Sequence, residues 1–196
     1  ESSTATYGNP QVTPTNVTSW NSTSTPDEIG VKFSLESSWT TNYNVLGVNG
    51  IFGITNSAST ATLKLYDSGG SLLQSKSFTA TEIYAGTNTA NLRTLMFDTS
   101  TLASLTPGST YRITVEVTNA SLGFTTMLQV NFPNNTVVRA FTGSGIYQRT
   151  QRTDAGAWTD TDTAVPAWKL LISAATASGG GGAATEPRVG LNAGLN

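Results

Sequence analysis

The stretch YRITVEVT, residues 111–118, decides the fold class of this chain. Its apolar and polar side chains alternate with a period of two, which is typical of a β-strand with one buried face. We therefore predict a strand with two distinct rows. The core-facing row holds Tyr111, Ile113, Val115 and Val117, and the other row holds Arg112, Thr114 and Glu116.

The same alternation recurs between residues 27 and 175. In VKFSL, residues 31–35, it places Val31, Phe33 and Leu35 inward. Trp168 shares a face with Leu170 and Ile172, which predicts a core position for this indole. Further strands are predicted at 45–54, 91–97, 122–131, 136–141, 146–152 and 167–173, with a short helix at 99–105.

A hairpin is predicted over residues 61–78, where ATLKLY is followed by DSGG and SLLQSKSF. Leu63 and Leu65 face inward before the turn, and the pair Gly69-Gly70 supplies the positive φ that a tight turn requires. After the turn either Leu72 or Leu73 resumes the inward row, depending on the register.

These elements predict an all-β protein. About nine or ten strands with turn signals every 8–15 residues favour an antiparallel β-sandwich of the jelly-roll or Greek-key type. We expect three parts: an extended N-terminal arm at 1–26, the sandwich at 27–175, and a Gly-rich C-terminal tail at 176–196. The tail contains four consecutive glycines, a composition typical of flexible linkers.

The composition narrows the function classes. Charged residues make up only 11% of the chain, against roughly 25% in typical domains, and 34 Thr and 21 Ser supply much of the polarity. The net charge is −2 and Lys and Arg form no cluster, so we expect no nucleic-acid partner. The sequence has no apolar run long enough for membrane insertion. Because His and Cys are both absent, we predict no triad or thiolate catalysis, no catalytic residues and no cofactor.

The densest chemistry lies in residues 146–168, where we single out Arg149, Arg152, Asp154, Trp158 and Asp160. Two interpretations are open. These side chains could form a contact site for a glycan or a neighbouring subunit, with Trp158 as the flat apolar platform and the charged groups as hydrogen-bonding partners. The preferred interpretation is a structural hairpin, in which Arg149 and Asp160 form a cross-strand pair and Asp154 lies in the turn.

Calcium is a weaker interpretation of the same region. Asp160 and Asp162 are two residues apart, and carboxylate oxygens suit Ca²⁺. The Gly and closing Glu of the patterned calcium loop are missing, however, so we predict no metal site.

Several stretches resemble non-catalytic jelly-roll modules of phage virion proteins and bacterial surface proteins. The resemblance rests on the hairpin pattern L-x-L-Y-D-x-x-G-x-L-L, residues 63–73, and on Pro-Gly-x-x-Tyr-Arg-Ile, residues 107–113, which leads into a late strand. The closing RTDAGAWTD stretch, residues 152–160, is also similar. The resemblance implies a building or binding module and names no catalytic residue.

We therefore expect a non-enzymatic structural component of a virion surface or extracellular assembly, such as a capsid decoration protein or a tail-associated accessory. Its partners would be copies of itself or other structural subunits, held through residues 1–26 and 176–196 by strand addition. The alternative is a carbohydrate-binding module of a secreted or surface protein, with a glycan bound by Trp158, Arg149 and Arg152.

Overall fold

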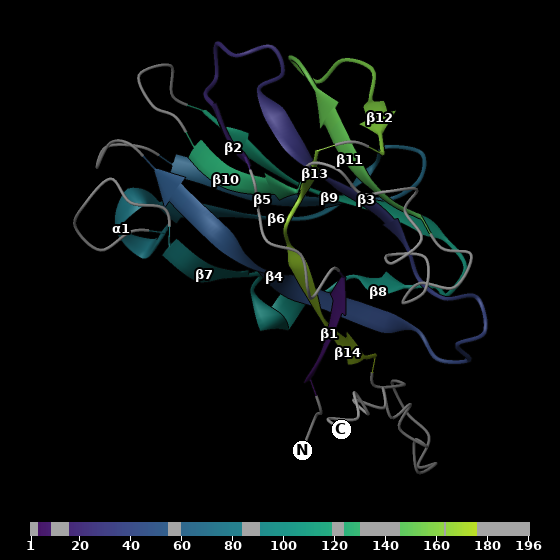
Figure 1. Ribbon diagram of the computed structural model, residues 1–196. Helices are drawn as coiled ribbons and strands as arrows, with labels where there is room; N and C mark the ends of the chain where they lie inside the picture. Colours follow the sequence, from purple (N-terminus) through teal and green to yellow (C-terminus); the bar gives the residue numbers. More distant parts are fainter. Residues whose placement is uncertain are drawn as a thin grey trace, which may run out of the picture.

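The chain folds as an all-β sandwich of two antiparallel sheets, as predicted (Figure 1). The computed structural model describes residues 4–8, 16–54, 60–83, 91–118, 124–129, 146–162 and 164–175. Within these ranges lie fourteen strands, the four-residue helix α1 (Ala80–Ile83) and the 3₁₀ turn η1 (Thr99–Thr101). They include no helix with the length and hydropathy needed to cross a membrane.

The first sheet has six strands and carries the candidate site. Most of its neighbouring strands are far apart in the sequence, because β3 pairs with both β9 and β11. Such long-range antiparallel pairing is typical of Greek-key connections. In order across the sheet the strands are β12 (Thr159–Thr161), β11 (Tyr147–Arg152), β3 (Glu28–Ser34), β9 (Thr110–Val117), β5 (Thr60–Tyr66) and β6 (Leu72–Thr79).

The second sheet has eight strands arranged around the long β4 (Tyr43–Ile54). Its main path runs β1 (Thr4–Gly8), β14 (Lys169–Ala174), β4, β10 (Phe124–Gln129) and β13 (Val165–Pro166). Beside this path, β2 (Asn16–Trp20) pairs with β10, while β7 (Asn91–Met96) and β8 (Ser104–Leu105) pair with β4.

Parts of the predicted N-terminal arm belong to this second sheet. β1 pairs with β14, and β2 pairs with β10. Trp20, at the end of β2, is buried in the core, and its indole N–H donates to the carbonyl of Val115 in the other sheet. Residues 4–8 and 16–20 are thus strands that pair within their own chain, whereas residues 21–26 form turns and bends.

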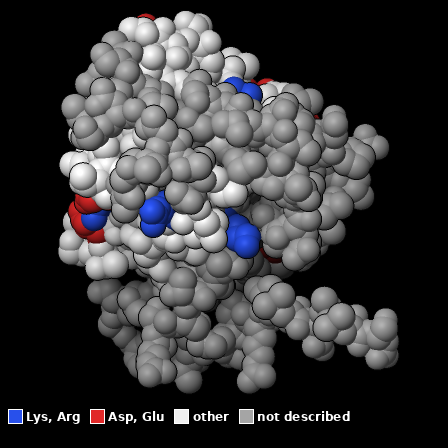
Figure 2. All heavy atoms as spheres, turned by 60° about the vertical axis from the view of Figure 1, so that its left-hand side comes forward, with Lys and Arg blue, Asp and Glu red and all other residues white. Residues whose placement is uncertain are grey.

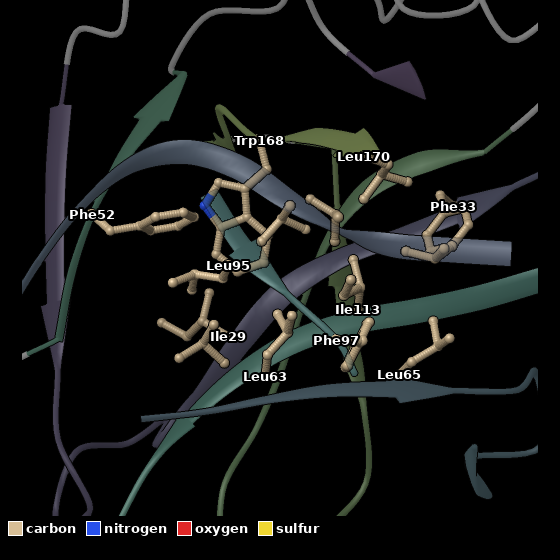
Figure 3. Packing of buried hydrophobic residues seen from close by; sticks show 14 of the residues in the cluster. Ile29, Phe33, Phe52, Leu63, Leu65, Leu95, Phe97, Ile113, Trp168 and Leu170 are labelled. Carbon is tan, nitrogen blue, oxygen red and sulfur yellow. The ribbon is translucent and has the colours of Figure 1, made fainter. Parts of the chain in front are cut away.

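The core fills the space between the sheets (Figure 3). Trp168 is fully buried, as predicted, and packs edge-on against Phe52 with ring centres 5.5 Å apart. Its indole N–H donates to Thr126 Oγ1, so the ring's single polar group is satisfied inside the core. The inward rows predicted for β3 and β9 are confirmed, since Val31, Phe33, Leu35, Tyr111, Ile113, Val115 and Val117 are all buried.

Several local predictions differ from the structure. The strand count exceeds nine or ten because short strands such as β8, β12 and β13 carry few sequence signals. Neither Leu72 nor Leu73 resumes the inward row: they are 51% and 39% exposed, and Gln74 lies opposite Leu65 instead. A register irregularity next to Tyr66 shifts the pairing there.

The predicted helix at 99–105 is also wrong in part, because only the short turn η1 forms before β8. A helix does form elsewhere, at α1. Glu82 accepts hydrogen bonds from the backbone N–H and hydroxyl of Thr79, the T-x-x-E arrangement of a capping box. The predicted strand at 136–141 and the tail at 176–196 lie outside the described residues.

Candidate functional site

The candidate site lies on the outer face of the six-stranded sheet, away from the core. Directly paired residues of antiparallel strands share a face. Because Val31 points into the core, its neighbours along β3 point outward, together with their partners on β9 and β11. We call the resulting group the outer cluster; it comprises Glu28, Lys32, Tyr66, Arg112, Thr114, Thr150, Arg152, Trp158 and Asp160.

Glu28 is the centre of one half of the outer cluster. Its side chain is almost fully buried, at 1% exposure. Arg152 Nε donates to Glu28 Oε2 at 2.7 Å, while Tyr66 and Thr114 donate their hydroxyl protons to Glu28 Oε1. Arg152 also donates to the Tyr66 oxygen at 2.6 Å. Burial, the nearby charge of Glu28 and the hydrogen bond to it raise the pKa of Tyr66 well above 10, so this phenol stays protonated.

Asp160 is the centre of the other half. Lys32 Nζ lies 2.7 Å and Arg112 Nη2 3.1 Å from Asp160 Oδ2, and Thr150 donates to Oδ1 at 2.7 Å. Burial acts to raise the pKa of Asp160, but the hydrogen bonds from Lys32 and Thr150 and the charge of Arg112 outweigh it and lower the pKa. Asp160 is therefore ionised at neutral pH.

Trp158 covers both halves of the outer cluster. The guanidinium carbon of Arg152 lies 4.2 Å and that of Arg112 5.3 Å from the centre of the indole ring. Tyr66 meets the same ring edge-on with centres 5.3 Å apart. A Cβ built on Gly70, in the β5–β6 turn, would lie 3.5 Å from Trp158 Nε1. The indole is thus half-buried between the β5–β6 hairpin and its own β11–β12 hairpin, with the guanidinium groups of Arg152 and Arg112 against it.

A tight turn delivers Trp158 to this position. The Gly156 N–H donates to the Thr153 carbonyl at 2.8 Å, and Asp154 and Ala155 between them both have positive φ, 48° and 57°. These angles resemble those of a type I′ turn, the kind that matches the twist of a β-hairpin. The backbone N–H of Asp154 also contacts the buried carboxylate of Asp27, while the Asp154 side chain is exposed.

The structure divides the sequence-predicted site residues between two faces. Arg152, Trp158 and Asp160 come together in the outer cluster. Arg149 lies opposite Val31 and Thr161. It comes three positions before Arg152 in β11, so the two side chains point to opposite faces of the sheet, and Arg149 points to the inner face. The predicted Arg149–Asp160 pair is wrong: Asp160 lies opposite Thr150, one position along.

The contacts of the two candidate calcium ligands argue against a calcium site. Asp160 is neutralised by two cations, and Asp162 accepts a hydrogen bond from Gln148 at 2.8 Å. The described residues contain no group of three or more His, Cys, Asp or Glu side chains arranged to hold a metal ion.

Sequence reasoning missed the partners that come from other strands, above all Glu28, Lys32, Tyr66 and Arg112. Part of the signal was present. Lys32 and Arg112 alternate with core residues in their strands, which places them on the outer face. What the sequence lacks is the order of the strands, which brings β3 and β9 beside β11.

The chemistry of the outer cluster is that of a closed network. Its three cations and two carboxylates pair with one another, and the carboxylate oxygens already accept hydrogen bonds from within the chain. Such a network orients side chains and joins strands. On the face shown in Figure 2, the described basic side chains form small separate spots.

The fold and site together define a class, an all-β two-sheet sandwich whose charged residues join the strands of one sheet. Comparison with protein-family models finds no family that matches the chain. Comparison with curated proteins likewise finds no matching sequence.

Proposed function

We propose that the chain is a non-enzymatic structural component of a larger surface assembly, and specifically a phage virion protein that serves in capsid decoration or as a tail-associated accessory. The observation that carries this proposal is the closed outer cluster. Among the residues that the structure describes, the densest group of charges serves to join β3, β5, β9, β11 and β12, and its carboxylates are occupied by internal partners. The sequence resemblance to virion jelly-roll modules supports the finer assignment.

The proposed contacts with copies of the chain or with other structural subunits involve residues 1–26 and 176–196. β1 ends the main path of its sheet and pairs with β14 along one side. In the part of the chain that the structure describes, no strand pairs with its other side. An unpaired strand edge is a template for strand addition by another chain.

Two truncations test this proposal. Full-length chain and variants lacking residues 1–8 or 176–196 are compared for incorporation into particles and for mass by sedimentation. Circular dichroism verifies that each truncated chain is folded. We expect the full-length chain in purified particles and a loss of incorporation on truncation. A full-length chain that remains monomeric and enters no particle contradicts the proposal, and unchanged incorporation of both variants removes the termini from it.

The second candidate function is carbohydrate binding, as in modules of secreted or surface proteins. It is favoured by buried hydrogen-bonding atoms of Arg149 and Gln151 that lack a partner. A glycan array probed with wild type, Trp158→Ala and Arg149→Met tests it. Loss of signal in Trp158→Ala alone assigns binding to the outer face, and loss in Arg149→Met alone assigns it to the inner face. A wild type that binds no glycan rejects this candidate.

A further inference from the structure

The strands β12 and β11 lie at one end of the six-stranded sheet, at the upper right of Figure 1. A second group of polar side chains lies on their inner face. Next to it, the inward residues of β3 are the apolar Ile29 and Val31. On β11 and β12 the corresponding positions are polar, because Gln151 pairs with both Ile29 and Thr159, and Arg149 with both Val31 and Thr161. We call these four side chains the inner margin: Arg149, Gln151, Thr159 and Thr161.

Two atoms of the inner margin are buried without a hydrogen-bond partner, namely Arg149 Nε and Gln151 Oε1. Among the described residues only one other side-chain atom shares this property, Gln74 Nε2 on β6 at the far end of the sheet. Most buried polar groups in proteins are satisfied, so two exceptions on one face of one strand require an explanation. Residues two apart in a strand lie about 6–7 Å apart. The side chains of Arg149 and Gln151 are only partly buried, so one small ligand can span them from the exposed side.

Arg149 also differs from the other arginines of the site. Arg112 and Arg152 each have a carboxylate partner, whereas none of the ion pairs among the described residues includes Arg149. Burial lowers the pKa of Arg149, which is the effect of removing a guanidinium from water without an anion beside it. A bound anion would offset that cost.

The two unpaired atoms specify complementary ligand chemistry. Arg149 Nε donates a hydrogen bond and favours an anionic oxygen. Gln151 Oε1 accepts, so the ligand must also bring a donor. An ionised Asp or Glu side chain has acceptors only and would leave Gln151 unsatisfied. A sugar acid carries a carboxylate and hydroxyl donors on one rigid ring. Thr159 is exposed and lies opposite Gln151 on the neighbouring strand, where a threonine hydroxyl can bond further sugar hydroxyls.

We infer that the inner margin binds an acidic sugar, whose carboxylate contacts Arg149 and whose hydroxyl group donates to Gln151. This inference rests on the second candidate function and goes further, because it names the face and the class of glycan. It is independent of the outer cluster, which lies on the opposite side of β11.

In the test, the full-length chain is titrated with small probe molecules, and binding is measured by calorimetry or ligand-observed NMR. The probes are glucuronate and N-acetylneuraminate, with glucose and galactose as neutral sugars and glutarate and a Glu-rich peptide as carboxylates without a sugar ring. We expect the two acidic sugars to bind most tightly. Arg149→Met should weaken their binding about tenfold or more, the usual effect of losing a charged hydrogen bond. Gln151→Leu should weaken it as well.

Arg93→Met is the matched control, because Arg93 lies on β7 in the other sheet. Thermal melting verifies that every variant is folded. Equal binding of neutral and acidic sugars overturns the acidic assignment and leaves carbohydrate binding standing. Equal binding of glutarate or the peptide overturns the sugar assignment. Binding that survives Arg149→Met but is lost in Trp158→Ala overturns the assignment to the inner margin, and absence of binding to any probe overturns the inference together with the second candidate function.

Discussion

The guanidinium carbon of Arg152 lies 4.2 Å from the centre of the Trp158 ring, so the residue that ends β11 is covered by the residue that precedes β12. The same guanidinium forms an ion pair with the buried carboxylate of Glu28. A cation stacked on an aromatic ring and paired with a buried carboxylate is fixed in orientation. This contact joins the 153–158 turn to the sheet and closes the outer cluster.

Arg152→Ala is expected to lower the free energy of unfolding by about 3–5 kcal/mol, because it leaves the carboxylate of Glu28 buried without its cation. Urea denaturation at neutral pH measures the change. Lys76→Ala is the matched control: it breaks the more exposed pair with Asp98 and should cost less than about 1 kcal/mol. The double variant Glu28→Gln/Arg152→Met should recover part of the loss. Equal costs for the two alanine variants would show that the Glu28 pair contributes no more than a surface contact.

Gly30→Ala is expected to destabilise the chain by about 3 kcal/mol, because an added Cβ meets backbone that cannot move aside. Gly30 lies between Thr150 and Thr114 on the outer face of β3. A Cβ there would be 2.0 Å from the carbonyl oxygen of Ile113 in the adjacent strand. Gly69→Ala is the control, because the nearest atom to its Cβ is Asp67 Oδ1 at 3.4 Å. Chemical denaturation of both variants checks this, and similar stabilities would contradict it.

The sequence predicted the sandwich well because its strongest signal, the alternation in β9 and β3, is local. It predicted the site less well because the site depends on register. Arg149 and Asp160 differ from the observed pairing of Thr150 with Asp160 by a single position. A slip of one residue moves a side chain to the other face of the sheet.

The burial of the outer-face side chains of β9 could likewise not be predicted from the local sequence. Arg112 and Thr114 read as one polar row, yet both are buried. Their burial comes from Trp158, in the turn before β12, and from Tyr66 on β5. Trp158 contacts Arg112, and Tyr66 and Thr114 share the carboxylate of Glu28. Only the order of the strands brings these residues together, and short strands such as β12 give no periodic signal from which that order could be inferred.

Ala155→Gly is expected to raise the free energy of unfolding by about 1 kcal/mol. Ala155 has φ of 57°, and a side chain in this left-handed region costs energy that glycine avoids. Ala157→Gly, in the same loop but without positive φ among the backbone angles, is the control and should be neutral or slightly destabilising. Thermal melts compare the two. An Ala155→Gly variant no more stable than Ala157→Gly would show that the turn is relaxed with alanine.

Asp160→Asn is expected to reduce the decrease in the free energy of unfolding at acid pH. The pKa of Asp160 is lowered on folding from its ordinary value of 3.8, so its ionised form stabilises the native state. That contribution is fully present above pH 3.8 and is lost as the pH falls through the lower folded value. Urea unfolding between pH 7 and pH 2 should therefore show a steeper decline below about pH 4 for wild type than for the variant. Parallel curves would mean that the carboxylate gains nothing from Lys32 and Arg112.

Arg149→Met is expected to raise the free energy of unfolding by about 1–2 kcal/mol when no ligand is present. Its guanidinium is half-buried with an unpaired Nε, and methionine fills a similar volume without that desolvation cost. Arg93→Met should change stability by less than about 0.5 kcal/mol. Saturating glucuronate should then stabilise wild type and leave Arg149→Met unchanged, since a ligand stabilises only the state that binds it. A destabilised Arg149→Met would show that the arginine already has favourable partners. A stabilised variant would identify Arg149 as a residue whose presence lowers stability, as is common where binding and stability make opposing demands.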